Sequence, residues 1–340
     1  MDGMIKRIKY TAVLAIAAAA FAAAADAGTP NTGWYSAKPK AKSFTISTAD
    51  ELAGLAQIVN GTWGGKPAKD SFAGKTVKLA GDIDLSSYDN WDPIGGWDPA
   101  HNTSIPFSGT FDGSGRVIRG LTINRPDKKD RGLFGYIERG RVKNLGLEGV
   151  NILGAGYVGA LAGTVWRSSS VVNCYSTGTV SATSTHAGGL AGAVVDSSRL
   201  ANSYSTAAVR SENHSGGLAG RVGSNSSITS CAALNPEVAA TGSDAIAGRI
   251  IGSIADSKLG PVTLSNNIAN AGLKNSDGSA TWPGRSADRR DGADISASEI
   301  NADGTLGGRF KGGKSGWTAA PGKLPGLGGK TVEMPEHLRQ

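Results

Sequence analysis

A glycine-flanked phrase recurs along this chain at an almost constant interval. Four copies are clear, and they are Gly132-Leu-Phe-Gly135, Gly159-Ala-Leu-Ala-Gly163, Gly188-Gly-Leu-Ala-Gly192 and Gly216-Gly-Leu-Ala-Gly220. We interpret Ala245-Ile-Ala-Gly248 as a degenerate fifth copy, so the last Gly advances by 28, 29, 28 and 28 residues. A fixed period in this range is typical of a solenoid, in which each repeat packs on its neighbours.

One apolar position of the repeat is expected to form a column inside the solenoid. Its members are Leu133, Leu161, Leu190, Leu218 and Ile246. The runs of residues between the glycine clusters are too short for helices and have lengths that suit strands. Parallel strands joined by turns, with like residues stacked on successive coils, make a parallel β-helix. The predicted fold class is therefore all-β, a single-stranded parallel β-helix.

A second position of the repeat carries Asn144, Asn173 and Asn202, and Ser230 takes this position in the next copy. Asn tolerates left-handed backbone, so we expect a stacked corner with a ladder of amides along it. Cys174 and Cys231 both follow this position and lie 57 residues, or two repeats, apart. Coils stacked at the strand spacing would separate them by roughly 9.6 Å, whereas a disulfide needs Cα atoms within about 7 Å. The spacing predicts two buried, unpaired thiols.

The two ends of the chain differ from the repeats. Residues 1–27 combine basic residues, an Ala-rich apolar run and the small-x-small sequence Ala25-Asp-Ala27, which is the pattern of a signal peptide. Thr48 and Glu51 form a capping box that opens a helix, expected to cover the first edge of the solenoid. The predicted organisation is a signal peptide at 1–27, an N-terminal cap and first irregular coils at 28–130, repeats at 131–275, and an irregular C-terminal region with a basic tail at 276–340.

Composition restricts the class of partner. The formal net charge of +7 suits an acidic polysaccharide or another anionic surface, although the charges are spread along the chain. Residues 308–315 match the phosphate-loop pattern but are flanked by neither a predicted strand nor a predicted helix, so nucleotide binding is not expected. No second long apolar segment follows the signal peptide, so we expect no membrane span in the mature chain. We also expect no cofactor, no metal and no nucleic-acid partner.

Two further stretches accompany the repeat series. Phe44-Thr-Ile-Ser47 leads to Gly81-Asp-Ile-Asp-Leu85, and Trp91-Asp-Pro-Ile-Gly95 leads through Phe107-Ser-Gly-Thr-Phe-Asp-Gly113 to Ile123. Together with the Gly-Leu-Ala-Gly copies, they resemble the GLUG-motif family of bacterial exported proteins over about residues 43–250. The resemblance implies a right-handed parallel β-helix on a secreted or cell-surface protein, often adhesin-like. The repeat also occurs beside a metallopeptidase domain, but no histidine here is followed by Glu, so the His-Glu-x-x-His zinc motif of that domain is missing.

Two pairs of residues are weak candidates for a site, and no catalytic residue can be assigned. Tyr175 and Tyr204 are expected to stack on the outside of the coil as a platform for a sugar face. Asp82 and Asp84 lie two apart on a predicted strand and could act as an acid and base pair, although their setting also suits turns. His186 and His214 share a register. We interpret them as residues of a solvated turn, which is a simpler explanation than a metal site.

These observations predict an exported, non-catalytic β-helix protein. Its expected role is a cell-surface adhesin, a spacer or a component of the extracellular matrix or biofilm, and the periplasm is an alternative location. One alternative function is a carbohydrate-active enzyme, a lyase or hydrolase acting on an acidic glycan. Another is a glycan- or ice-binding module that uses the repeated threonines Thr177 and Thr206.

Overall fold

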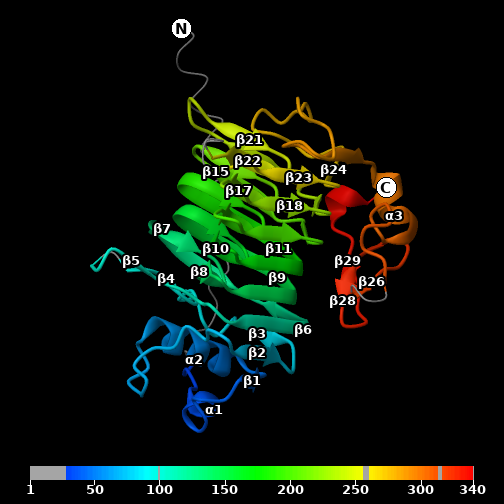
Figure 1. Cartoon of the computed structure of the whole chain (residues 1–340). Helices are drawn as coiled ribbons and strands as arrows, with labels where there is room; N and C mark the ends of the chain where they lie inside the picture. Colours follow the sequence, from blue (N-terminus) through cyan, green and yellow to red (C-terminus); the bar gives the residue numbers. More distant parts are fainter. Residues whose placement is uncertain (1–27, 99, 256–259, 313–315, 340) are drawn as a thin grey trace.

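The computed structural model describes residues 28–98, 100–255, 260–312 and 316–339. The expected signal peptide at 1–27 lies outside the described residues. The described part of the chain winds into a parallel β-solenoid of about nine turns, as predicted (Figure 1). Within these ranges, no helix combines the length and the apolar character that a bilayer span requires.

A large sheet of 18 strands forms most of the coil, because several of its strands continue around a corner. Its strands are β1 (Ser43–Ile46), β2 (Thr76–Leu79), β3 (Ile83–Asp84), β6 (Thr110–Arg119), β7 (Thr122–Arg131), β9 (Arg141–Gly159), β11 (Ser170–Gly188), β13 (Arg199–Ala201), β14 (Tyr204–Ser205), β15 (Ala208–Ser211), β16 (His214–Gly216), β18 (Ser227–Thr229), β19 (Ala232–Ala233), β20 (Val238–Ala240), β21 (Ile246–Gly248), β23 (Thr263–Ser265), β24 (Ile268–Asn270) and β25 (Ala293–Ile295).

The second face of the coil is a five-stranded sheet with the strand order β22-β17-β12-β10-β8. Its strands are β8 (Phe134–Glu138), β10 (Ala162–Trp166), β12 (Ala191–Val194), β17 (Ala219–Val222) and β22 (Ile251–Ile254). Three antiparallel pairs lie outside the coil: β4 (Gly96–Asp98) with β5 (Thr103–Ile105), β26 (Trp317–Thr318) with β28 (Gly326–Leu327), and β27 (Lys323–Leu324) with β29 (Val332–Glu333).

A helix covers the N-terminal end of the stack, as predicted. Helix α2 (Ala49–Asn60) begins at the expected capping box, in which Thr48 and Glu51 bond reciprocally to each other's backbone N–H groups. Its apolar face, with Leu52, Leu55 and Val59, is buried. Figure 1 shows α2 and the short α1 (Gly33–Ser36) at the end of the stack. The helix thereby shields the apolar interior and the edge of the first coil from other chains.

The predicted leucine column forms the centre of the solenoid. Leu133, Leu161, Leu190 and Leu218 are each 0% exposed. The amide of Leu161 donates to the carbonyl of Leu190 over 2.9 Å, and Leu190 donates to Leu218 over the same distance. Each leucine therefore lies directly against its counterpart in the next coil.

The prediction that Ile246 is the fifth member of this column was wrong. Its side chain is 37% exposed, and its backbone pairs in register with that of His214. The buried Ile250 continues the column, because Leu218 donates to its carbonyl over 3.0 Å. The true fifth phrase is thus Gly248-Arg-Ile-Ile-Gly252.

An insertion explains this shift in register. Ser211 pairs with Ala240, 29 residues further on, whereas His214 pairs with Ile246, 32 residues further on. Three extra residues therefore lie in the turn after Ala240. A fixed period cannot detect an insertion of this kind, because the turn extends outward without disturbing the strands on either side.

The asparagine ladder is present and is longer than predicted. Asn144, Asn173 and Asn202 have the left-handed φ values of 56°, 54° and 47°. The amide of Asn173 donates to Asn144 over 3.0 Å, and that of Asn202 donates to Asn173 over 2.6 Å. Asn266 extends the ladder by donating to Ser230 over 3.1 Å. These side chains stabilise the corners that separate the strands.

The two cysteines are buried and unpaired, as their spacing predicted. Burial raises the pKa of both Cys174 and Cys231 to about 12. Both thiols are therefore protonated and unreactive at neutral pH.

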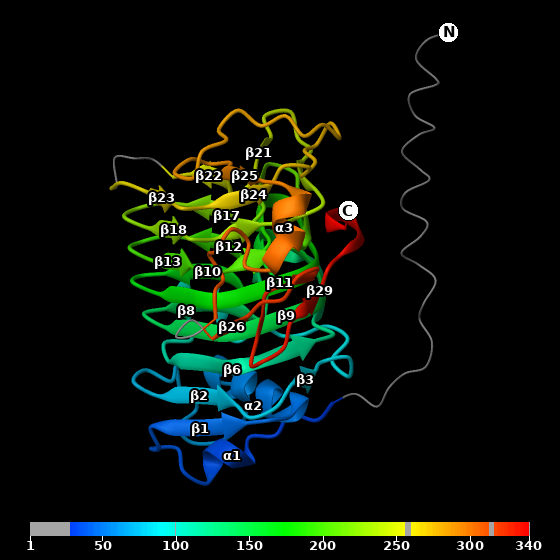
Figure 2. The same ribbon diagram turned by 90° about the vertical axis from the view of Figure 1, so that its right-hand side faces the viewer.

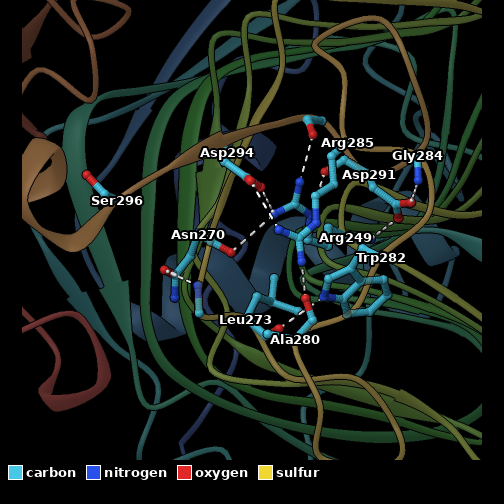
Figure 3. Close-up of polar contacts among 12 residues, drawn as sticks. Arg249, Asn270, Leu273, Ala280, Trp282, Gly284, Arg285, Asp291, Asp294 and Ser296 are labelled. Atoms are coloured by element: carbon cyan, nitrogen blue, oxygen red, sulfur yellow. Dashed lines mark hydrogen bonds and ion pairs between the residues drawn. The ribbon is translucent and has the colours of Figure 1, made fainter.

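A buried arginine closes the C-terminal end of the coil (Figure 3). Arg249 is 0% exposed, and its guanidinium donates to the Asp294 carboxylate over 2.6 Å and to the carbonyl of Gly292 over 2.7 Å. In the preceding coils, Gly189 and Gly217 hold this position because a Cβ there would lie 2.3 Å and 2.1 Å from a backbone oxygen of the next coil. The last coil has room for a side chain at this repeat position. The Arg249 side chain occupies it and binds the segment that follows.

The C-terminal region forms a second layer on the large sheet. It includes α3 (Ala297–Asp303) and the 3-10 helix η2 (Glu336–Leu338), and Figure 2 shows it running across β9 and β11. Trp317 packs on the solenoid at mid-height, while Lys330 reaches Asp82 in the first coils over 2.7 Å. Residues 296–312 and 316–339 and the outer face of the large sheet together form a second apolar core outside the coil.

Candidate ligand-binding groove

The structure places the predicted tyrosine pair in the second apolar core. Tyr175 and Tyr204 stack as expected, with ring centroids 5.2 Å apart and planes 5° from parallel. However, they are only 1% and 0% exposed, because Trp317 and Phe310 cover them. The Tyr204 hydroxyl donates to the carbonyl of Pro325 over 2.7 Å. The prediction of an exposed sugar platform at this pair was wrong.

The predicted acidic pair has structural partners. The Asp82 carboxylate accepts hydrogen bonds from Lys330 and from the amide of Val117, over 2.7 Å and 3.0 Å. Partial burial alone would raise its pKa, but these two donors lower it below the usual value. Asp84 accepts a bond from the amide of Ser86 and so closes a turn. The Asp82 carboxylate is therefore not available in the protonated form that a general acid needs at neutral pH.

The predicted threonine array is also not presented to solvent as a flat surface. Thr206 is 7% exposed, and the hydroxyl of Thr177 accepts a hydrogen bond from the amide of Gly149 over 2.8 Å. The register therefore lacks the exposed threonine ladder that an ice-binding surface would require.

The histidine pair belongs to an aromatic stack along one corner. His186 lies 4.8 Å from His214 and 5.0 Å from Tyr157 between ring centroids, with all three rings nearly parallel. Burial, with the nearby His214 and Arg221, lowers the pKa of His186 to about 4, so it is neutral at physiological pH. Across the described residues, no three His, Cys, Asp or Glu side chains converge in a way that could hold a metal ion.

A different site is present on the outer face of the five-stranded sheet. It is an open groove of about 320 Å³, a volume within the usual range for small-ligand sites. The residues that follow the last Gly of successive repeat phrases form its floor, in register across the strands: Tyr136, Thr164, Ala193 and Arg221. The small side chain of Ala193 leaves the hollow between its larger neighbours.

Three aromatic side chains surround this groove. Trp97 comes from the β4–β5 hairpin, which projects beside β8 (Figure 1), and its side chain is 43% exposed. Its ring centroid lies 6.5 Å from that of Tyr136. Tyr157 contributes from the corner stack. The molecule thus presents an exposed ring face next to polar groups.

A buried carboxyl group lies at the inner edge of the groove. Asp130 has a φ of 56° and occupies the left-handed corner position that Tyr157 and His186 hold in the next two coils. It is 7% exposed and accepts a hydrogen bond from the Thr164 hydroxyl over 2.7 Å. Burial raises its pKa to about 6, although Thr164 opposes this shift.

Two cations complete the lining. Arg221 projects from β17, and Lys129 precedes Asp130 on β7. Both side chains bring positive charge into the groove, and Lys129 interacts electrostatically with the neighbouring Asp130. The sequence did carry a signal for this site, since the residue after each closing Gly varies in chemistry while the leucine column does not. What it could not show was that the β4–β5 hairpin brings Trp97 to the same place.

Comparison with known proteins agrees with this architecture. The model of the GLUG motif matches residues 154–181, which run from β9 into β11. A Gly-rich membrane protein of Evansella cellulosilytica is 44% identical over 95 residues, or 26% of this chain and 11% of that protein. Halomucin of Haloquadratum walsbyi is 32% identical over 136 residues, or 39% of this chain and 1% of that protein. The chain therefore spans only a small part of the length of either relative.

One solved structure shares the fold. It is described as an immunoglobulin A1 protease from Bacteroides ovatus, and it matches with a TM-score of 0.57 and 20% sequence identity. The alignment covers 86% of this chain and 92% of that one. At this level of identity the similarity concerns the β-helix alone. Taken with the repeat series, the match at residues 154–181 identifies this chain as a carrier of the GLUG motif.

Proposed function

We propose that this protein is exported and acts at the cell surface as a non-catalytic adhesin or matrix component that binds a glycan in the groove. The observation that carries the proposal is the exposed Trp97 beside Tyr136 and Tyr157 above a hollow floor. Aromatic faces with a few fixed polar groups are a common way to hold a ligand that is apolar on one side and polar on its edges. The signal-peptide pattern at 1–27 and the relatives described as a membrane protein and a halomucin support a surface location.

A glycan and extracellular-matrix array tests this proposal, with the protein lacking residues 1–27 as the probe. We expect binding to a restricted set of glycans, and we expect the substitution Trp97→Ala to abolish it. Ile254→Ala is a matched control, because Ile254 is an exposed apolar residue, 51% exposed, on the opposite edge strand of the same sheet. Failure of the protein to bind any glycan, or equal loss in both variants, would contradict the proposal.

A carbohydrate-active enzyme is the second candidate, and one residue favours it. Asp130 is a carboxyl group with a pKa raised to about 6 by burial, the kind of group that can act as a general acid near neutral pH. The two functions are distinguished by incubating the glycans of the array with the protein and assaying for new reducing ends or unsaturated sugars. Product formation that is lost in Asp130→Asn would favour the enzyme, whereas binding without product favours the adhesin.

A further inference from the structure

We infer that the groove selects an extended polysaccharide of uronic acid residues, with one sugar ring on Trp97 and the carboxylates of other sugars at Arg221 and Lys129. This inference rests on the proposed glycan-binding function and adds the charge of the ligand to it.

The floor of the groove has the length for an extended chain. Tyr136, Thr164, Ala193 and Arg221 lie on four neighbouring strands of the five-stranded sheet. At the usual strand spacing, the distance from Tyr136 to Arg221 is roughly 14 Å. The ring-binding end at Trp97 and the cationic end at Arg221 are therefore separated by more than one sugar ring. An oligosaccharide fits this arrangement better than a single monosaccharide does.

The balance of charge in the groove is positive. Lys129 and Arg221 contribute two positive charges to the lining, and Asp130, which interacts electrostatically with Lys129, contributes at most one negative charge. Glu138, on the same sheet face, is already compensated by Arg139 and Arg167, at 3.0 Å and 3.1 Å. A carboxylate on the ligand would thus meet a lining that keeps one net positive charge even when Asp130 is ionised.

The other titratable groups at this corner cancel only part of that charge. Asp130 is buried and hydrogen-bonded to Thr164, and burial raises its pKa to about 6, so it offsets at most one of the two cations at neutral pH and less below about pH 6. Burial also lowers the pKa values of His186 and His214, which keeps the histidine stack neutral.

Guanidinium is well suited to the recognition of a carboxylate. It can donate two parallel hydrogen bonds in a fixed planar geometry, and charge-assisted bonds of this kind are roughly twice as strong as neutral ones. A neutral sugar offers only hydroxyl groups to Arg221. The two cations therefore distinguish a uronic acid from its uncharged counterpart.

Titration calorimetry with tetragalacturonate and with its methyl ester tests the inference, since the two ligands share the sugar backbone and differ in charge. We expect the ester to bind the mature protein about tenfold more weakly than the acid. The substitution Arg221→Gln should weaken binding of the acid by a similar factor and leave binding of the ester unchanged. Arg199→Gln, at an exposed arginine of β13 on the large sheet, serves as the matched control and should change neither affinity.

The outcomes separate this inference from the function on which it rests. If the acid and the ester bind equally and Trp97→Ala abolishes both, the protein binds glycans but the preference for acidic sugars is overturned. Unchanged affinity of Arg221→Gln for the acid overturns the assignment of the carboxylate to this groove. If neither ligand binds and the glycan array is also silent, the proposed function itself fails.

Discussion

At the scale of single residues, Asp130 is an energetically unfavourable group in the fold. A carboxyl group that is 7% exposed has lost most of its hydration, and the single hydrogen bond from Thr164 replaces only part of it. Its pKa of about 6, above the ordinary 3.8, measures that cost. A retained buried carboxyl at the edge of a groove is more readily explained by a function there than by stability.

The raised pKa predicts how stability changes with pH. Because the folded state binds the Asp130 proton more tightly than the unfolded state, the stabilising effect is complete below about pH 4 and is lost as pH rises through about 6. The substitution Asp130→Asn keeps the side-chain acceptor and the left-handed corner but removes the ionisation. We expect the variant to be more stable than the wild type at pH 7.5, by on the order of 2 kcal/mol, and equally stable at pH 4.

Urea unfolding of both proteins at these two pH values is the measurement. Other groups titrate over the same window, so the difference between variant and wild type is the informative quantity. A difference that does not depend on pH would show that Asp130 is not the group responsible.

At the scale of elements, the corners define the coil as much as the strands do. The strand segments of β11 turn through Asn173, whose left-handed φ of 54° would cost most other residues about 1 kcal/mol or more. Its amide also joins the ladder that links Asn144 and Asn202. The ladder therefore combines a local backbone preference with contacts between coils.

Substitution of Asn173 separates these two contributions. Asn173→Ala removes both, and we expect a loss of about 2 kcal/mol in the free energy of unfolding. Asn173→Gly restores only the backbone freedom, so it should recover part of the loss while leaving the ladder broken. Denaturant midpoints of the three proteins provide the comparison. Equal stability of the Ala and Gly variants would show that backbone conformation at this corner contributes little.

At the scale of the whole molecule, the repeat period predicted what is periodic and little else. The buried column, the stacked asparagines and the unpaired cysteines followed from the sequence because each coil repeats the surroundings of the last. Ile246 was misplaced because a turn insertion leaves no trace in a short degenerate phrase. The groove and the covered Tyr175 and Tyr204 depend on non-repeating segments, the β4–β5 hairpin and residues 296–312 and 316–339, whose docking no internal period can specify.

The docked C-terminal segment carries the last prediction. Trp317 is 2% exposed and its ring lies 5.0 Å from that of Phe310 and 5.7 Å from that of Tyr204, so it anchors the segment to the solenoid. Trp317→Ala should lower the free energy of unfolding of this layer by about 3 kcal/mol, the usual cost of removing a buried tryptophan side chain. The coil itself has its own core and should stay folded.

Limited proteolysis followed by mass spectrometry locates the change. We expect cleavage of Trp317→Ala within residues 296–312 and 316–339 to be faster than in the wild type, with the repeats still protected, because the layer opens as a local unit. Trp97→Ala is the control, since the same substitution at an exposed tryptophan should change stability by no more than about 0.5 kcal/mol. Simultaneous cleavage of the repeats would instead show that the outer layer and the solenoid unfold as one cooperative unit, and that the second core is needed to hold the coils together.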